Sequence, residues 1–312
     1  MRGLLDFNRR GLMAAGAAGA LAPLPLVARA AAQPAPRANN ASFTHLPPRE
    51  QPSFTERMVD IPGARLYMRD SSGAGAPIVL VHPASGSAMI WGYQLPAFVK
   101  AGHRVIAYSR RGYANSSPFD KGTPGSGSQD LFELARALQL PRFHLVASAA
   151  GGSISMDFAL SHPEMLLSLT ISSNSAGVRE GAIFRAAEQT KPAGWDKMPV
   201  DFRELGPSYR AVNAEGVKLW LDLEHHALIG TDYRQTPTNR ISDASLRSVK
   251  PPVLLISGAA DLITPPAITR LLMDAIPRSE MVVADETGHS VYWERPDIFN
   301  AAVLDFIARH RA

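Results

Sequence analysis

The fold is decided by residues 143–152, which read FHLVASAAGG. The mostly apolar residues at 143–146 are typical of a buried strand, and the small residues that follow suit a tight turn. A helical pattern continues over 151–161. The stretch therefore predicts a strand, a sharp turn and a helix. The turn lies at the carboxyl end of the strand, where open α/β sheets place their ligand sites.

The same alternation of strand and helix runs through most of the chain. Short apolar runs predict strands at 58–61, 65–69, 78–81, 105–108, 143–146, 167–171, 253–256 and 281–283. Helical periodicity lies between most of them, at 91–101, 129–138, 151–161, 267–276 and 296–310. This pattern predicts an α/β fold with a mostly parallel, doubly wound sheet of about eight strands and helices on both faces. Pro62-Gly63 predicts an antiparallel hairpin at one edge.

The alternation fails in one place, between residues 172 and 250. This segment is too long for a crossover between strands and too periodic for a loop, so it predicts a helical insertion. We expect a helical cap at about residues 176–248, within a single domain that spans 53–312.

The N-terminus has the layout of an export signal. Arg9-Arg10 precedes an apolar run that is rich in Ala and Gly and contains Pro23 and Pro25, and small residues follow at 28–32. A membrane span needs about 20 strongly apolar residues, so a cleaved signal over 1–32 is favoured. The arginine pair resembles the twin-arginine type. We expect a periplasmic or secreted protein with a Pro-rich, extended leader at 33–52 and no stable membrane anchor after cleavage.

Composition excludes several classes of function. The chain has 312 residues, of which 46% are hydrophobic, and it contains no cysteine. This excludes global disorder, disulfides, thiolate zinc sites and a cysteine nucleophile. The net charge of +4 is reduced once residues 1–32 are removed, because 28 basic and 27 acidic residues remain. The remaining basic residues are scattered, so a nucleic-acid partner is not expected. The sequence does not set the oligomeric state.

Polar and small residues follow several predicted strands in a set order. The segments are HPASG at 82–86, SRRGYANS at 109–116, ASAAGG at 147–152, then Asp261 and later Gly288-His289. Together they resemble the α/β-hydrolase superfamily, of the type with a helical cap. The resemblance covers about residues 53–312 and implies the α/β-hydrolase fold, a small-molecule substrate and no cofactor.

The resemblance also assigns roles to residues. It places Ala149 at the position of the nucleophile, Asp261 at that of the acid and His289 at that of the base. The backbone N–H groups of Ala84 and Ala150 match the donors of the oxyanion hole. Alanine cannot attack a carbonyl, so this chain departs from the family pattern at the nucleophile.

Four interpretations of Ala149 stay open. In the first, His289 acts as a general base on a small, largely apolar carbonyl compound in a lyase-type reaction without a covalent intermediate. In the second, the protein is an ester hydrolase that uses Ser148 or a water molecule activated by the base. In the third, it binds a small ligand without catalysis. In the fourth, Ala149 replaces an original nucleophile by design.

Other residues are assigned by their positions near this site. Ser85, Trp91, Tyr113 and Tyr292 are predicted to line the substrate pocket. Arg110-Arg111 is interpreted mainly as a brace of its loop, with an anion site as the alternative. His225-His226 does not indicate a metal site, because adjacent residues on a helix point about 100° apart. No metal site is predicted.

Overall fold

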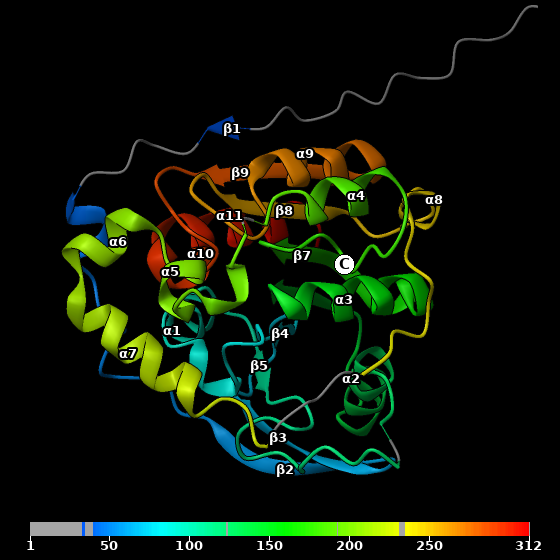
Figure 1. The fold of residues 1–312 in the computed structure, drawn as a ribbon. Helices are drawn as coiled ribbons and strands as arrows, with labels where there is room; N and C mark the ends of the chain where they lie inside the picture. The colour runs from blue at the N-terminus through cyan, green and yellow to red at the C-terminus, as the bar shows by residue number, and fades with distance from the viewer. Residues whose placement is uncertain (1–32, 35–39, 123, 192, 231–234, 312) are drawn as a thin grey trace, which may run out of the picture.

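The computed structural model describes residues 33–34, 40–122, 124–191, 193–230 and 235–311. The predicted signal over 1–32 lies outside the described residues. A nine-stranded sheet, in the order β1-β9-β8-β7-β6-β4-β5-β3-β2, forms the centre of the molecule (Figure 1). The strands are β1 (Gln33–Pro34), β2 (Thr55–Ile61), β3 (Ala64–Asp70), β4 (Ile78–Val81), β5 (Val105–Tyr108), β6 (Phe143–Ser148), β7 (Leu166–Ser172), β8 (Val253–Gly258) and β9 (Ser279–Ala284).

The predicted fold class is confirmed. The eight expected strands are β2–β9. Neighbouring strands are parallel along the part of the sheet that runs β5-β4-β6-β7-β8-β9. The hairpin of β2 and β3 is antiparallel and lies at one edge. At the other edge, the two-residue strand β1 pairs with β9 and was not predicted.

Helices cover both faces of the sheet, as its continuously apolar strands require. One face packs against α2 (Gly127–Ala137), α3 (Ala150–Ser161) and α9 (Pro266–Ala275). The other packs against α1 (Gln94–Lys100), α10 (Val291–Glu294) and α11 (Pro296–Arg309). Each face has its own apolar core, with Leu131 and Leu272 in the first and Phe98 and Phe306 in the second.

The insertion between β7 and β8 contributes to both cores. Its helices are α4 (Ala182–Glu188), α5 (Val200–Glu204), α6 (Pro207–Val212), α7 (Ala214–His225) and α8 (Asp243–Leu246). Ile183 and Leu246 belong to the first core, whereas Tyr209 and Trp220 belong to the second. Helices α5, α6 and α7 gather on one side of the molecule, away from α2 and α3 (Figure 1). The insertion therefore crosses from one side of the sheet to the other.

The leader predicted at 33–52 is not simply extended. Phe43, in a 3-10 helix at Asn40–Phe43, is only 1% exposed and packs edge-on against the ring of Tyr209 in α6. Asn213 donates hydrogen bonds to the carbonyls of Phe43 and His45. An aromatic side chain gains about 1.5–3 kcal/mol from full burial, which explains why this part of a Pro-rich segment joins the core. Within the described residues, no helix is long and apolar enough to cross a membrane.

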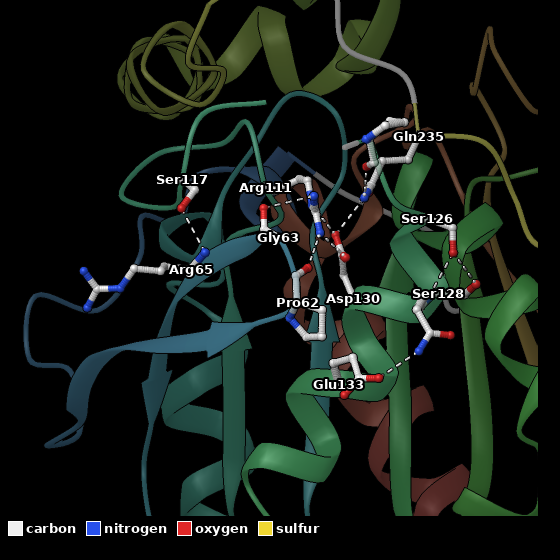
Figure 2. A network of polar contacts seen from close by, with 12 residues as sticks. Pro62, Gly63, Arg65, Arg111, Ser117, Ser126, Ser128, Asp130, Glu133 and Gln235 are labelled. Carbon is white, nitrogen blue, oxygen red and sulfur yellow. Dashed lines mark hydrogen bonds and ion pairs between the residues drawn. The ribbon is translucent and has the colours of Figure 1, made fainter. Parts of the chain in front are cut away.

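A buried ion pair joins four separate segments on the side of α2 (Figure 2). Arg111, after β5, donates from Nε and Nη2 to the two carboxylate oxygens of Asp130 in α2, at 2.8 and 2.6 Å. Arg111 also donates to the carbonyl of Pro62 in the β2–β3 turn, and Gln235 of the insertion donates to Asp130. The pair thus fixes the loop after β5 to the hairpin, to α2 and to the insertion.

Replacement of Asp130 by Asn should destabilise the protein. It leaves the Arg111 guanidinium buried without its counter-charge, which costs about 3–5 kcal/mol in free energy of unfolding. Asp60→Asn is the matched control, because Asp60 pairs with Arg65 at the surface and such pairs contribute about 0–1 kcal/mol. Urea unfolding followed by circular dichroism measures both. Equal losses in the two variants would contradict a structural role for the buried pair.

Candidate functional site

The turn between β6 and α3 has the backbone of a strained elbow. Ala149 adopts φ 46° and ψ −123°, a region that residues other than glycine rarely occupy. Its N–H donates to the carbonyl of Ser172 at 2.9 Å, which holds the turn against β7. A Cβ at Gly151 would lie 2.3 Å from the carbonyl oxygen of Val81, so only glycine fits where α3 passes β4. The geometry that presents a nucleophile is therefore retained, but it presents a methyl group.

Ser148 occupies a different environment. It is the last residue of β6 and is fully buried, at 0% exposure. Its Oγ forms no hydrogen bond to any described residue. A side chain that precedes the elbow tip points into the layer between sheet and helices, where a substrate has no access.

His289 and Asp261 lie together, although they are 28 residues apart in the chain. Nδ1 of His289 donates to the carboxylate of Asp261, at 2.9 and 3.0 Å from its two oxygens. The backbone N–H groups of Ile263 and Thr264 also donate to Asp261. Because Nδ1 carries the proton that faces Asp261, Nε2 is the nitrogen left to exchange a proton with a ligand.

The pKa values of the pair shift in opposite directions. Burial opposes ionisation of both groups, but their mutual attraction and hydrogen bond outweigh it. The pKa of Asp261 is therefore lowered from its ordinary value, helped by the two backbone donors. The pKa of His289 is raised above 6.5 by the charge of Asp261 and, to a smaller extent, by those of Glu204 and Glu294.

The loop after β4 is held by a neutral histidine. Nδ1 of His82 donates to the carbonyl of Pro83 at 2.7 Å, and Nε2 accepts from the N–H of Arg110 at 3.0 Å. Burial and the charge of Arg110 lower the pKa of His82 well below 6.5, so the ring keeps this bonding pattern. Ala84, which follows Pro83 in this loop, lines a cavity of about 280 Å³ together with Ala150. The two predicted oxyanion donors therefore border the same space.

The comparisons with known proteins agree with this architecture. A model described as the alpha/beta hydrolase family matches residues 78–302. The chain belongs to the alpha/beta hydrolase family. A candidate non-heme bromoperoxidase, BpoC of Mycobacterium tuberculosis, is 26% identical over 262 residues, which cover 78% of this chain and 98% of the relative. A 2-hydroxy-6-oxononadienedioate/2-hydroxy-6-oxononatrienedioate hydrolase of a Pseudomonas species is 24% identical over 273 residues, with 78% and 92% covered.

The fold also resembles solved structures. A bromoperoxidase from Bacillus anthracis superposes with a TM-score of 0.65 at 24% identity and covers 81% of this chain and 100% of its own. The family match and the names of the sequence relatives support a hydrolase-family enzyme.

This member of the alpha/beta hydrolase family carries a second carboxylate beside His289 that sequence reasoning missed. The backbone carbonyl of Glu204, at the end of α5, accepts from the N–H of His289 at 2.8 Å and from that of Ser290 at 3.1 Å. Its side chain accepts from Oγ of Ser85 at 2.7 Å. Burial raises the pKa of Glu204, while His289 and Ser85 oppose that rise. Glu204 therefore connects the His289 loop with the loop of Ala84, and Ser85 acts as its partner.

A buried acid fixes this connection. The carboxylate of Glu294 accepts from the N–H groups of Gly206 and Gly288, at 2.8 and 3.1 Å. The two glycine backbones approach so closely that a Cβ at Gly288 would lie 2.4 Å from the nitrogen of Gly206. Burial raises the pKa of Glu294 to about 8, against the opposing effect of these donors. Since Gly206 follows α5 closely, this contact holds Glu204 in place beside His289.

The remaining predicted pocket residues separate into two groups. Tyr113 lines the 280 Å³ cavity. Trp91 and Tyr292 do not line it. Both are fully buried in the second core, with ring centroids 5.2 Å apart. Large aromatic side chains gain most from core packing, which explains their place. Among the described residues, no group of His, Cys, Asp and Glu is arranged to hold a metal ion.

The pKa of His289 should respond separately to the charge of Asp261 and to that of Glu204. We expect a pKa above 6.5 in the wild-type protein, so the neutral base forms only as the pH rises through that value. Asp261→Asn should lower the pKa most, and Glu204→Gln should lower it by less, because each removes a negative charge near the ring. NMR titration of the imidazole nitrogens measures these shifts. Glu215→Gln, on the exposed face of α7, is the control and should leave the pKa unchanged. An equal effect from Glu215→Gln and Glu204→Gln would contradict the placement of Glu204.

Proposed function

We propose that this protein is an exported enzyme that transforms a small carbonyl or ester compound by general base catalysis at His289, without a serine nucleophile. One observation carries the proposal: the strained elbow presents Ala149, while the His289–Asp261 hydrogen bonds are in place. Export rests on Arg9-Arg10 and the apolar run after them. Cell fractionation would locate the mature chain in the periplasm or medium.

The covalent route is closed to this chain. A serine nucleophile accounts for about a million-fold in rate, and binding plus an oxyanion hole leaves about 10³–10⁴ over water. Ala149 has no atom that can form an acyl-enzyme. Ser148 has a hydroxyl, but it is fully buried and lies one residue before the elbow tip. Both observations support catalysis through proton transfer alone.

The retained residues suit such a proton transfer. Nε2 of His289 takes a proton from water, whose oxygen attacks the carbonyl carbon, or directly from a carbon acid of the substrate. The N–H groups of Ala84 and Ala150 stabilise the oxygen that gains negative charge, in either case. The imidazolium that forms is stabilised by Asp261 and Glu204. In the water route, the same proton passes to the leaving group when the tetrahedral intermediate collapses. In the carbon-acid route, the imidazolium returns the proton to another carbon of the enolate or to a leaving group that the enolate expels.

Activity should depend on His289. We expect the mature protein to convert members of a panel of small esters and non-ester carbonyl compounds, with products identified by mass spectrometry. His289→Ala should lower kcat/KM by about 10²–10⁴, because the general base is lost. His226→Ala is the control, since His226 is exposed at the end of α7. Turnover by His289→Ala at the wild-type rate would refute the assigned site. Ester cleavage assigns water activation, and conversion of non-esters assigns a lyase-type reaction.

A fluorophosphonate probe should distinguish the covalent route from this one. The mature wild-type protein should not be labelled, because no exposed serine lies at the elbow tip. Ala149→Ser should become labelled and gain ester cleavage, since the resemblance pairs a hydroxyl at this position with the base His289. The double variant Ala149→Ser/His289→Ala should lose that labelling. Labelling of the wild type that disappears in Ser148→Ala would contradict the proposal and assign Ser148 as nucleophile.

A further inference from the structure

Two adjacent arginines, Arg110 and Arg111, have different partners. Both are buried, at 7% and 2% exposure. Arg111 forms the two-pronged ion pair with Asp130 (Figure 2). Arg110 has no carboxylate within 4.0 Å among the described residues. Buried charges in proteins are normally paired, so the unpaired guanidinium of Arg110 requires an explanation.

The contacts of Arg110 engage only part of its guanidinium. Nη2 donates to the carbonyl of Pro83 at 3.0 Å, and Nε donates to Nε2 of His82 at 3.3 Å. The guanidinium lies 4.3 Å from the centre of the Tyr113 ring. Nη1 donates to none of the described residues. These neutral contacts hold the side chain in a fixed orientation, but they leave its charge uncompensated.

Arg110 borders the same cavity as the predicted oxyanion donors. The cavity of about 280 Å³ is lined by Ala84 and Ala150, by Arg110, and by Arg179 from the start of the insertion. Its volume is near the lower limit of about 300 Å³ for small-molecule pockets. The side chain of Arg179 forms no hydrogen bond or ion pair with any described residue. One buried arginine, Arg110, and one exposed arginine, Arg179, therefore border one small space, and neither forms an ion pair with a described residue.

One acidic residue, Asp157, also lines this cavity, so the two arginines and this aspartate give the lining a net charge of +1. Asp157 is buried, and each of its carboxylate oxygens already accepts two hydrogen bonds. The donors come from Ser128, Thr238 and Asn239, so the carboxylate serves to attach the last part of the insertion to α3. None of its bonds is to an arginine.

We propose that this cavity is a binding site for a carboxylate group of the substrate, held by Arg110 and Arg179. The inference rests on the proposed function, because it places the reacting carbonyl at Ala84 and Ala150 of the same cavity. A planar carboxylate has two oxygens, which suit one donor from Nη1 of Arg110 and a second from Arg179. The substrate is then a small carboxylic acid that carries a second, reactive carbonyl group. This inference differs from the sequence-based expectation of a largely apolar substrate.

Ligand binding tests this inference without any turnover. The probes are benzoate, phenylacetate and adipate, each compared with its neutral amide, and inorganic phosphate. Isothermal titration on the full mature chain measures the affinities. We expect the carboxylates to bind and the amides to bind at least tenfold more weakly. Arg179→Gln should weaken carboxylate binding about ten- to hundred-fold, because a charge-assisted hydrogen bond is lost.

The control is Arg185→Gln on α4, which removes the same charge from an exposed position outside the cavity and should leave the affinity unchanged. His289→Ala should still bind the carboxylates at least tenfold more tightly than the amides. If no compound of the panel is converted but the carboxylates bind in this pattern, the proposed function is refuted and the carboxylate site is supported. No binding by any carboxylate, equal binding of acids and amides, tighter binding of phosphate, or an unaffected Arg179→Gln would each overturn the site.

Discussion

The close crossing of backbones at the elbow is the constraint on which the site depends. α3 passes so near β4 that a Cβ at Gly151 would overlap the carbonyl of Val81, and the turn before it forces Ala149 to a positive φ. Such strain persists only where the surrounding structure imposes it. Here β4 and β7 hold the turn on both sides. Ala149 keeps the strained geometry although it has no hydroxyl for the turn to present, so the elbow itself does not require a nucleophile. The crossing of α3 and β4 also positions Ala150 at the rim of the cavity.

A second close approach joins the insertion to the histidine loop. Gly206 and Gly288 lie against each other, and the carboxylate of Glu294 accepts hydrogen bonds from both. Any side chain at either glycine would separate the two loops. Because Glu204 lies just before Gly206, this contact determines where its carboxylate lies relative to His289. The electrostatics of the base thus depend on packing between segments that are about 80 residues apart in the chain.

The apolar runs of the sequence were sufficient for every strand except the short β1, and the resemblance to the α/β-hydrolase superfamily supplied the His289–Asp261 pair. The sequence did not identify Glu204, since a glutamate in a short helix of an insertion resembles any surface residue until the fold places it. Trp91 and Tyr292 show the converse. Their position near the site motifs favoured the pocket, but burial of large rings in the second core decided their place. Arg110 and Arg111 are indistinguishable in sequence, and only tertiary contacts give one of them Asp130 as a partner.

The charges of the site are arranged asymmetrically. Asp261 and Glu204 raise the pKa of His289, while Arg110 and Arg179 border the cavity beside the predicted oxyanion donors. The raised pKa means that His289 retains an abstracted proton. The arginines that line the nearby cavity attract an anion. The charges of Asp261 and Glu204 favour an imidazolium at His289, and the proposed proton transfer creates one without needing a nucleophile at Ala149.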